Sequence, residues 1–236
     1  STASCSYNDV WSTSDSGSTW TQVVASAAWS KRVGHASVVY NDDIFVMGGR
    51  HNSDNVNNVW SSSHGGANWI QIVSSAEWSP RTYLSGVVYS SYIVLVGGES
   101  SEVWRSNDGG LNWMEAAVNA EWSDTGLFPT VVYDNNMFVL GVGDNRTAIW
   151  SSGDGGATWA VVTTDAPWST RYGAAAVVND GKIVFTGGQS STSLDDVWFY
   201  NRTTQTSIRT EPSQGMWMTG FVGLVAYASL KYVVRG

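Results

Sequence analysis

Three arginines recur at one position of a repeat and are the residues best placed for chemistry in this chain. Arg32, Arg81 and Arg171 each stand three residues after a tryptophan, and the same position holds Thr125 and Gly220 in two further copies. Guanidinium groups gathered by a repeat can bind an anion such as a carboxylate, because each presents several fixed N–H donors. Alternatively, each arginine bonds backbone carbonyls or an acidic side chain of the neighbouring repeat. The sequence leaves both interpretations open.

The other titratable residues offer little for catalysis or metal binding. A retaining glycosidase needs two carboxyl groups about 5 Å apart, whereas most acidic residues here lie in turn sequences. The three histidines and the single cysteine show no metal-ligand spacing, so no catalytic residue, metal or cofactor is expected. Cys5 has no second cysteine in the chain, which leaves an intermolecular disulfide or a free thiol. The residues concerned are Asp15, Asp108, Asp154, His35, His51, His64 and Cys5.

A tryptophan repeat sets the organisation of the chain. All 14 tryptophans follow it: four copies hold three of them at intervals of nine residues, and the last copy keeps two. The last tryptophan of each copy is followed 19 residues later by Gly-Gly or its remnant. A period of 44 to 49 residues fits one four-stranded propeller blade per copy. Within a single domain, 1–236, the copies cover about 8–49, 50–98, 99–143, 144–188 and 189–236.

Each copy contains apolar, β-branched runs separated by turn residues, which predict strands. A third strand begins at a Val-Trp pair or its equivalent, a fourth follows the second tryptophan, and no amphipathic helix is indicated. The expected fold class is therefore all-β. The paired runs are 34–40 with 44–47, 86–89 with 93–96, 130–133 with 137–140, and 175–178 with 183–186.

The two ends of the chain fall at complementary points of the repeat. The chain begins at a third strand and ends at a second strand, and a join from Gly236 to Trp11 would span 11 residues, within the 7 to 12 seen between copies. We therefore expect a five-bladed β-propeller with four antiparallel strands per blade, the last blade closed by N- and C-terminal strands. Segments 220–226 and 231–235 are expected to share that sheet with 10–12 and 20–24.

A second signature lies between the third and fourth strands. It reads Ser-Asp-Ser-Gly-Ser-Thr-Trp at 14–20, and it recurs at 107–113 and 153–159, with His64 at the aspartate position of the second copy. The turn carboxylate can accept hydrogen bonds from backbone N–H groups, and glycine supplies a positive φ. This hairpin resembles the Asp-box of sialidase-like (BNR) propellers. The Trp-Ser-x-Arg segment that leads through two strands to Gly-Gly resembles the kelch repeat. Together the resemblances cover nearly the whole chain, but both motifs belong to scaffolds.

Both resembled families contain enzymes, so the resemblance raises two reactions. Sialidases hold a carboxylate with an arginine triad and use a tyrosine–glutamate pair and an acid. In a kelch-type channel the three arginines would open onto one mouth, but the chain has no Phe/Tyr-Arg-Ile-Pro segment. A copper oxidase of the kelch type needs a cysteine-linked tyrosine and histidine ligands, and Cys5 lies in a terminal tail. We expect no enzyme activity, with a sialidase-like glycoside hydrolase as the weakest alternative.

The connection between the second and third strands is the variable part of the repeat. From the first glycine of the pair to the next tryptophan it measures 12, 7, 9 or 11 residues. Insertions in stacked repeats gather on one face, which often binds a ligand. Beside the three arginines, the binding candidates there are Arg50, His51, Tyr83 and Tyr172, although solvated loops explain these four nearly as well. A carbohydrate-binding, lectin-like module is the main alternative function, with most of the tryptophans assigned to the core.

Charge and sequence motifs indicate the environment of the chain. The net charge of −8 argues against nucleic acid and anionic membranes as partners, and no run of 18 apolar residues predicts membrane insertion. Asn145 and Asn201 stand in Asn-Arg-Thr sequons in predicted loops. The chain does not begin with Met, which suggests processing or excision. We expect a secreted or cell-surface glycoprotein with a structural or adhesive role, which forms a homo-oligomer or filament or binds extracellular proteins or glycans.

Overall fold

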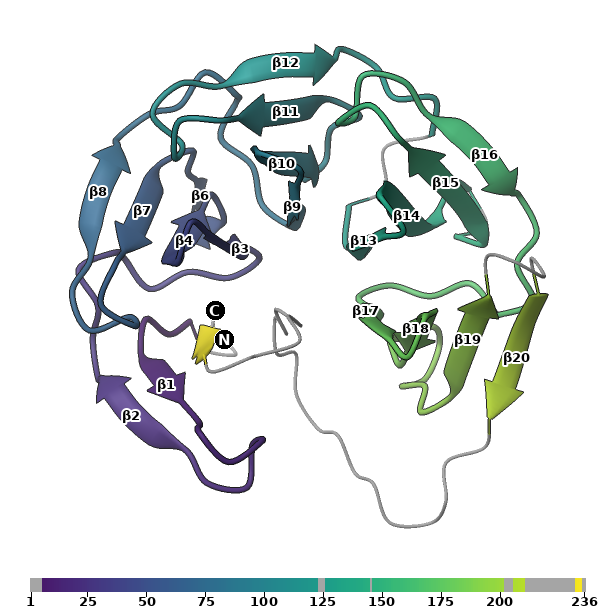
Figure 1. Ribbon diagram of the computed structural model, residues 1–236, viewed down its shortest axis with the longest axis horizontal. Coiled ribbons are helices and arrows are strands. Elements are labelled where there is room, and N and C mark those ends of the chain that lie inside the picture. Colours follow the sequence, from purple (N-terminus) through teal and green to yellow (C-terminus); the bar gives the residue numbers. More distant parts are fainter. Residues whose placement is uncertain (1–5, 123–125, 145, 202–205, 211–231, 235–236) are drawn as a thin grey trace.

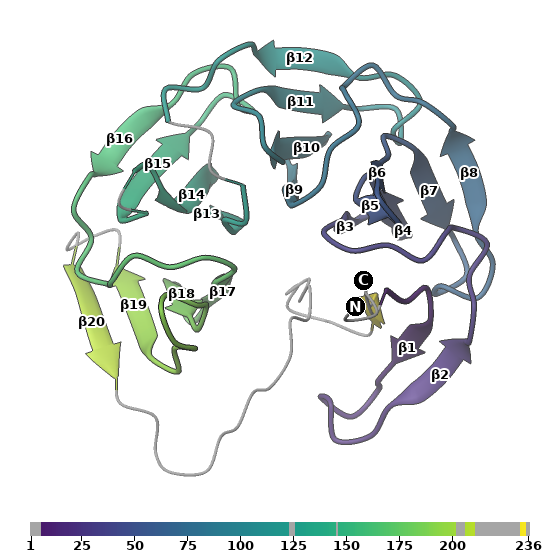
Figure 2. The same ribbon diagram turned by 180° about the vertical axis from the view of Figure 1, so that it is seen from behind.

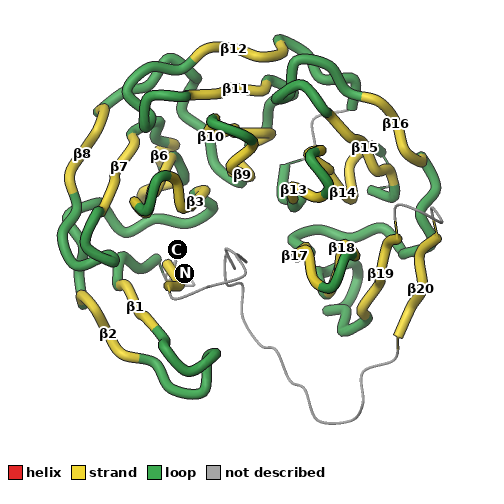
Figure 3. The backbone as a smooth tube through the Cα atoms, viewed as in Figure 1, coloured by secondary structure: helices red, strands yellow, loops and turns green. Residues whose placement is uncertain are grey.

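The computed structural model describes residues 6–122, 126–144, 146–201, 206–210 and 232–234. For the last two ranges it describes only the backbone. The described chain consists of strands and turns, so it contains no helix that could cross a membrane. Its sheets stand around a central axis, and each four-stranded sheet has its first strand nearest the axis (Figures 1 and 3). This is the arrangement of an all-β propeller, as expected from the repeat.

Four sheets are complete blades of four antiparallel strands, ordered along the chain from the axis outward. Blade one contains β3 (Ala36–Tyr40), β4 (Asp43–Met47), β7 (Val59–Ser62) and β8 (Ile70–Val73). Blade two contains β9 (Leu84–Tyr89), β10 (Tyr92–Gly97), β11 (Val103–Ser106) and β12 (Met114–Ala117). Blade three contains β13 (Thr130–Tyr133), β14 (Asn136–Val142), β15 (Ala148–Ser152) and β16 (Ala160–Thr163). Blade four contains β17 (Ala175–Asn179), β18 (Lys182–Thr186), β19 (Val197–Asn201) and β20 (Thr206–Thr210).

The described residues form these four blades, not the five that the sequence predicted. The remaining strands, β1 (Val10–Ser12), β2 (Thr21–Val24) and β21 (Tyr232–Val234), form a three-stranded sheet in the order β2-β1-β21. One C-terminal strand therefore pairs with the N-terminal hairpin. The segment 220–226, expected to supply the innermost strand, lies outside the described residues.

The register of this three-stranded sheet differs by one residue from that of the blades. In blade one Trp60 pairs with Val46, two residues before the glycine pair, whereas Trp11 pairs with Val233, three residues before Gly236. A shift of one residue exchanges the two faces of a strand, so this sheet does not reproduce the packing of a blade. In Figures 1 and 2, β2 and β20 stand at the two ends of the described arc of sheets.

The longest variable connection forms a structure that the sequence analysis did not predict. Residues Arg50–His51 (β5) and Asp54–Asn55 (β6) form a two-stranded ribbon beside blade one (Figure 2). Two backbone hydrogen bonds of 3.0 and 2.9 Å between Val33 and Arg50 hold the ribbon to the segment that leads into β3. The variable loop is therefore anchored to the inner part of its blade.

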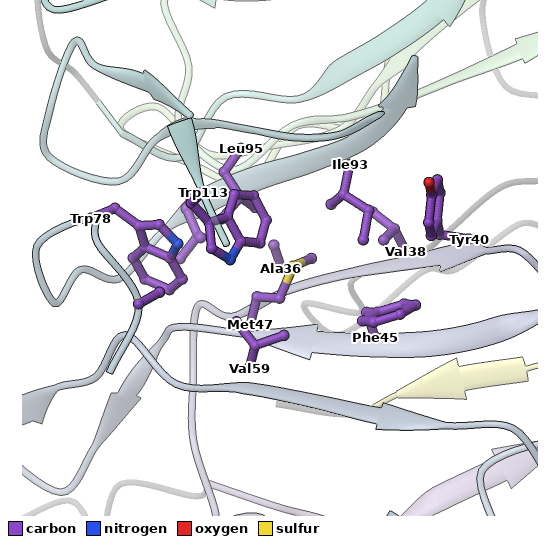
Figure 4. Close-up of a cluster of buried hydrophobic side chains, with 12 residues drawn as sticks. Ala36, Val38, Tyr40, Phe45, Met47, Val59, Trp78, Ile93, Leu95 and Trp113 are labelled. Atoms are coloured by element: carbon purple, nitrogen blue, oxygen red, sulfur yellow. The ribbon is translucent and has the colours of Figure 1, made fainter. Parts of the chain in front are cut away.

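The second strand of each blade forms the centre of the core. After their first residue β4, β10 and β14 are buried throughout, as their continuous apolar sequences predict. Figure 4 shows the cluster between blades one and two, in which Val38 and Phe45 of blade one lie with Ile93 and Leu95 of blade two. Burial of this kind of apolar surface is the main stabilising term in folding.

The repeated tryptophans pack the blades against one another. The third tryptophan of each of the first four copies is nearly inaccessible. In three of these copies the second tryptophan of the following copy packs edge-on against it. The separations between ring centroids are 5.8 Å for Trp29 and Trp69, 6.0 Å for Trp78 and Trp113, and 4.6 Å for Trp122 and Trp159. These second tryptophans are 5–8% exposed, but the corresponding Trp20 is 42% exposed. Most of the described tryptophans are buried or partly buried, as expected, and among them Trp20 is the exposed exception.

Tyrosine hydroxyls join each of the first three inner strands to the next blade. Tyr40 donates to the carbonyl of Ser91 at 2.9 Å, and Tyr89 donates to that of Gly153 at 2.6 Å. Tyr133 makes the same kind of bond to blade four at 2.8 Å. Each of these tyrosines is the last residue of its strand, so the bonds lie at one end of the inter-blade contact.

The aspartates between the third and fourth strands stabilise their hairpins. Asp108 accepts hydrogen bonds from the Ser106 hydroxyl (2.8 Å) and from the backbone and side chain of Asn112 (3.0 and 2.8 Å). Burial alone would raise the pKa of Asp108, but these bonds outweigh it and lower the pKa; the same holds for Asp154. The bond from the Thr19 side chain contributes most to lowering the pKa of Asp15 to about 2. These carboxylates therefore serve the turns.

His64 replaces the aspartate in blade one and cannot make these bonds. Its Nδ1 lies 2.9 Å from the Ser63 hydroxyl instead. His64→Asp is expected to raise the free energy of unfolding by about 0.5–1.5 kcal/mol, because the carboxylate would accept bonds from Asn68. Urea unfolding of both proteins measures this, and Asp108→His should lose a similar amount. An unchanged midpoint would mean that the bond from the Gly66 amide to the Ser62 hydroxyl (3.0 Å) suffices for the turn.

Candidate functional site

The repeated arginines are buried inside their own blades. Arg32 is inaccessible to solvent, and its Nη1 donates to the Gly48 carbonyl (2.8 Å) and to Asn58 Oδ1 (2.9 Å). Its Nε and Nη2 donate to the carbonyl and hydroxyl of Ser30, both at 3.1 Å. Burial lowers the pKa of Arg32 to about 10. This guanidinium therefore links three segments of one blade.

Arg81 and Arg171 make the same backbone bonds and add ion pairs. Each donates to the first carbonyl of its glycine pair, at 3.3 and 3.0 Å. Arg81 forms an ion pair with Glu102. Arg171 forms a bidentate ion pair with Asp196, in which Nη2 donates to Oδ2 at 2.8 Å. Burial alone would raise the pKa of Glu102, but the bonds from Trp104 and Arg81 lower it. Binding an external anion would require these bonds to break.

Each partner of an arginine stands two residues before the next tryptophan of the sequence. The position holds Asn58, Glu102 and Asp196 in the blades that carry the arginine, and Ala148 in blade three, whose sequence has Thr125 instead. The arginine and its polar partner are thus present or absent together in the four blades. The observed contacts are those of the structural interpretation, backbone carbonyls and an acid, but each acid belongs to the same blade as its arginine and not to the next blade.

A line of backbone hydrogen bonds connects the blades just before their inner strands. We call its four residues the rim: Gly34, Tyr83, Leu127 and Gly173, each five residues after a third tryptophan. The amides of Tyr83, Leu127 and Gly173 each donate to the carbonyl of the preceding rim residue, at 2.7, 3.3 and 3.1 Å in turn. All four have a left-handed φ between 56° and 65°. Tyr83 and Leu127 adopt it at an energetic cost, since they have a Cβ, and the bonds between blades hold them there.

Two arginine–tyrosine contacts lie beside the rim. Arg50, from the ribbon of blade one, places its guanidinium carbon 6.0 Å from the ring centroid of Tyr83 in blade two. Arg146, from the β14–β15 connection of blade three, lies 3.9 Å from the ring centroid of Tyr172 in blade four and donates to the Gly126 carbonyl at 3.0 Å. Arg146 is 7% exposed and Tyr172 is 48% exposed, so the tyrosine is the accessible member of the pair.

The predicted ligand-binding residues therefore fall into separate places. Arg50 and Tyr83 come together, and the neighbouring His51 has its Nδ1 2.8 Å from the Lys31 carbonyl. Tyr172 lies in another contact with Arg146, which the sequence analysis missed. The sequence did contain a signal for Arg146. Blade three has Thr125 in place of the repeated arginine, and its variable connection contains an arginine instead. None of these contacts by itself identifies a ligand.

The histidines and acidic residues of the described chain form no group of three that could hold a metal. His35 is packed with Trp29, and burial together with the charge of Arg32 lowers the pKa of His35 to about 3. It is therefore neutral at physiological pH. Cys5 and Asn145 lie outside the described residues, and Asn201 is the last residue of β19.

Two segments of the chain match a known family model. The Kelch motif matches residues 31–61, from the start of blade one into β7, and residues 170–209, which span most of blade four. Both segments begin next to a repeated arginine. These matches and the ring of sheets support a kelch-repeat β-propeller. No curated protein matches the chain.

Proposed function

We propose that this kelch-type propeller is a non-catalytic extracellular interaction module that associates with copies of itself or with other proteins. A kelch-repeat propeller suggests a protein-interaction module rather than an enzyme. The groups best suited to chemistry, the repeated arginines, are engaged within their blades. Apolar side chains on the outside of the ring remain available for contacts.

The exposed apolar side chains are the observation that carries this proposal. Ile70 on β8 is 64% exposed, Met114 on β12 is 47% exposed and Val161 on β16 is 50% exposed. Leu111 and Val118, on either side of β12, are 54% and 64% exposed. These strands are the outer edges of their blades, where backbone and side chains can both meet a partner. The outside of the ring is therefore the surface proposed for association.

The proposed location is secreted or cell-surface. The sequons at Asn145 and Asn201, the single Cys5 and the resemblance of the hairpins to Asp-boxes support it. In a eukaryotic source both asparagines would carry N-linked glycans. Comparing the intact mass of source material before and after glycosidase treatment tests that part, and an unchanged mass would contradict it.

Native mass measurement of source material, with and without reductant, tests self-association. We expect species larger than one chain at physiological concentration, and a partial shift to smaller species with reductant if Cys5 bridges neighbours. A monomer in both conditions would contradict the self-association.

Glycan binding is the second candidate function, and the accessible Tyr172 favours it, because an exposed aromatic ring can stack on a sugar. The buried Arg146 beneath this ring would hold it in place. A strictly monomeric chain that binds immobilised glycans would support this function in place of self-association.

A further inference from the structure

The hairpin of each of blades one to three docks on the sheet before it through a glycine. The two hairpin glycines of blade two, Gly109 and Gly110, lie after Asp108, and the second of them faces a valine of blade one. The closest approaches, from a Cβ built at the glycine to a valine Cγ1, are 2.7 Å for Gly66 and Val10, 3.0 Å for Gly110 and Val59, and 2.6 Å for Gly156 and Val103. A side chain larger than hydrogen would not fit there.

This contact buries both of its members in all three places. The three valines are fully inaccessible, and the tryptophan that follows each glycine is only 5–8% exposed. The indole nitrogen of that tryptophan donates to the glycine carbonyl at 2.8–3.1 Å, which fixes the ring against the hairpin. Hairpin glycine, tryptophan and facing valine thus form a repeated docking unit.

The N-terminal hairpin, residues 14–20, is formed in the same way but docks on nothing in the described chain. Its Trp20 donates to the Gly17 carbonyl at 3.1 Å, and Asp15 holds the turn through Thr19. Around a Cβ built at Gly17, the nearest described atom is in the ring of Trp20 itself, at 3.9 Å. Trp20 is 42% exposed. The hairpin is therefore formed in advance, and no other described residue packs on its glycine.

Blade four carries the complementary face. Val197 begins β19, as Val59 begins β7 and Val103 begins β11. Val197 remains partly accessible, whereas its two counterparts are fully buried. In the part of the chain that the structure describes, one hairpin thus has no facing valine, and one valine has no facing hairpin.

Among the described residues of one chain the two faces do not meet. The N-terminal hairpin and β19 lie at opposite ends of the described arc of sheets (Figures 1 and 2). Contacts with blade one hold the hairpin in place: Gly66 packs on Val10, and the Asn8 amide donates to the Trp29 carbonyl at 3.0 Å. Moving the hairpin toward β19 of the same chain would disturb these contacts, whereas docking on a second chain leaves them in place.

We propose that the N-terminal hairpin of one copy docks on Val197 of a second copy, with Gly17 against the valine and Trp20 buried between the two. This inference rests on the proposed self-association and names its surface. The two faces differ, so the contact is head-to-tail and builds either a closed ring of copies or an open series. No new fold is required, because the contact is one that the chain makes three times internally.

Cysteine cross-linking tests the contact directly. In the docked hairpins the built Cβ lies 3.7 Å from the valine Cβ at Gly66 and at Gly156, within the range of about 3.5–4.5 Å for a disulfide. In a full-length Cys5→Ser background, Gly17→Cys and Val197→Cys are prepared as two separate single variants. When the two are mixed under oxidising conditions, we expect a disulfide-linked dimer containing one chain of each, identified by peptide mass spectrometry.

A matched control accompanies this experiment. Val10→Cys with Gly66→Cys in one chain should cross-link within that chain, and Gly66 shares with Gly17 a φ of 88°, so both cysteines carry the same backbone strain. A control that cross-links while the mixture of single variants does not would overturn the proposal. So would a Gly17→Cys, Val197→Cys double variant that forms its disulfide only within one chain, since the hairpin would then dock on its own blade four.

Substitution of Trp20 provides a second readout. Trp20→Ser is expected to weaken self-association by about tenfold or more in sedimentation experiments, since buried tryptophans dominate interfaces. Its thermal unfolding under conditions that keep the chain monomeric should stay close to that of the parent. Val39→Ser is the matched control, because Val39 is also exposed (38%) but lies on β3, the innermost strand of blade one, and not on the outer surface proposed for association. If the parent associates and Trp20→Ser leaves association unchanged, self-association stands and this surface is wrong.

Discussion

Trp113→Ala is expected to lower the free energy of unfolding by about 3–5 kcal/mol. The indole is 5% exposed, packs edge-on against Trp78 and donates to the Gly110 carbonyl, so its removal leaves a cavity between blades one and two. The same change at the equivalent Trp20 is expected to cost less than about 1 kcal/mol in the monomer, because that ring is largely exposed. The same substitution at two equivalent positions of the repeat, Trp113 and Trp20, should therefore lower the free energy of unfolding by different amounts.

Chemical denaturation followed by circular dichroism measures both variants under identical conditions. Equal losses at the two positions would mean that Trp20 is as well packed as Trp113. A small loss at Trp113 would mean that blades one and two close over the space left by the ring. Either result would contradict the packing described for the blades.

Arg171→Thr is expected to lower the free energy of unfolding by about 3–5 kcal/mol. The side chains of Arg171 and Asp196 are 1% and 11% exposed, so the substitution leaves a carboxylate buried without its cation. It also leaves the Gly187 carbonyl without its donor at 3.0 Å. The remaining bond from the Trp198 indole at 2.8 Å cannot neutralise the charge.

Blade three offers a natural control for this substitution. Its sequence has Thr125 and Ala148 at the two positions, so Arg171→Thr with Asp196→Ala reproduces a combination that the chain already uses. The double variant is expected to be more stable than Arg171→Thr alone, because no unpaired charge remains buried. Thermal unfolding of the parent, Arg171→Thr, Asp196→Ala and the double variant completes a double-mutant cycle. A double variant less stable than both single variants would show that the ion pair is not the reason for the loss.

The sequence predicted the blades well because their signals are periodic and local. Continuous apolar runs identified β4 and β10, and the fixed spacing of the tryptophans placed Trp69 and Trp113 in the core. Turn chemistry placed Asp108 in its hairpin. Each of these depends on interactions within one copy or between neighbouring copies, which the repeat makes visible.

Other features depend on contacts that spacing does not encode. The ribbon of β5 and β6 depends on how one variable loop meets Val33, and the contact of Arg146 with Tyr172 joins two blades through residues outside the repeat. The exposure of Trp20 could not be predicted either, because its position in the repeat is the same as that of three buried tryptophans. Five blades were expected from counting copies, but a sheet also needs the register that β1 and β21 do not share with the blades.

The tyrosine hydroxyls and the rim bonds have a mechanical consequence when taken together. Tyr40 and Tyr89 bond to the next blade at one end of the inner strands, and Tyr83 and Leu127 bond to the preceding blade before the other end. Because neighbouring blades are bonded at both ends of their inner strands, a hinge-like separation of two blades is opposed. A force applied to one outer strand is therefore shared by the neighbouring blades. A module fastened in this way can transmit tension from one partner to another without opening.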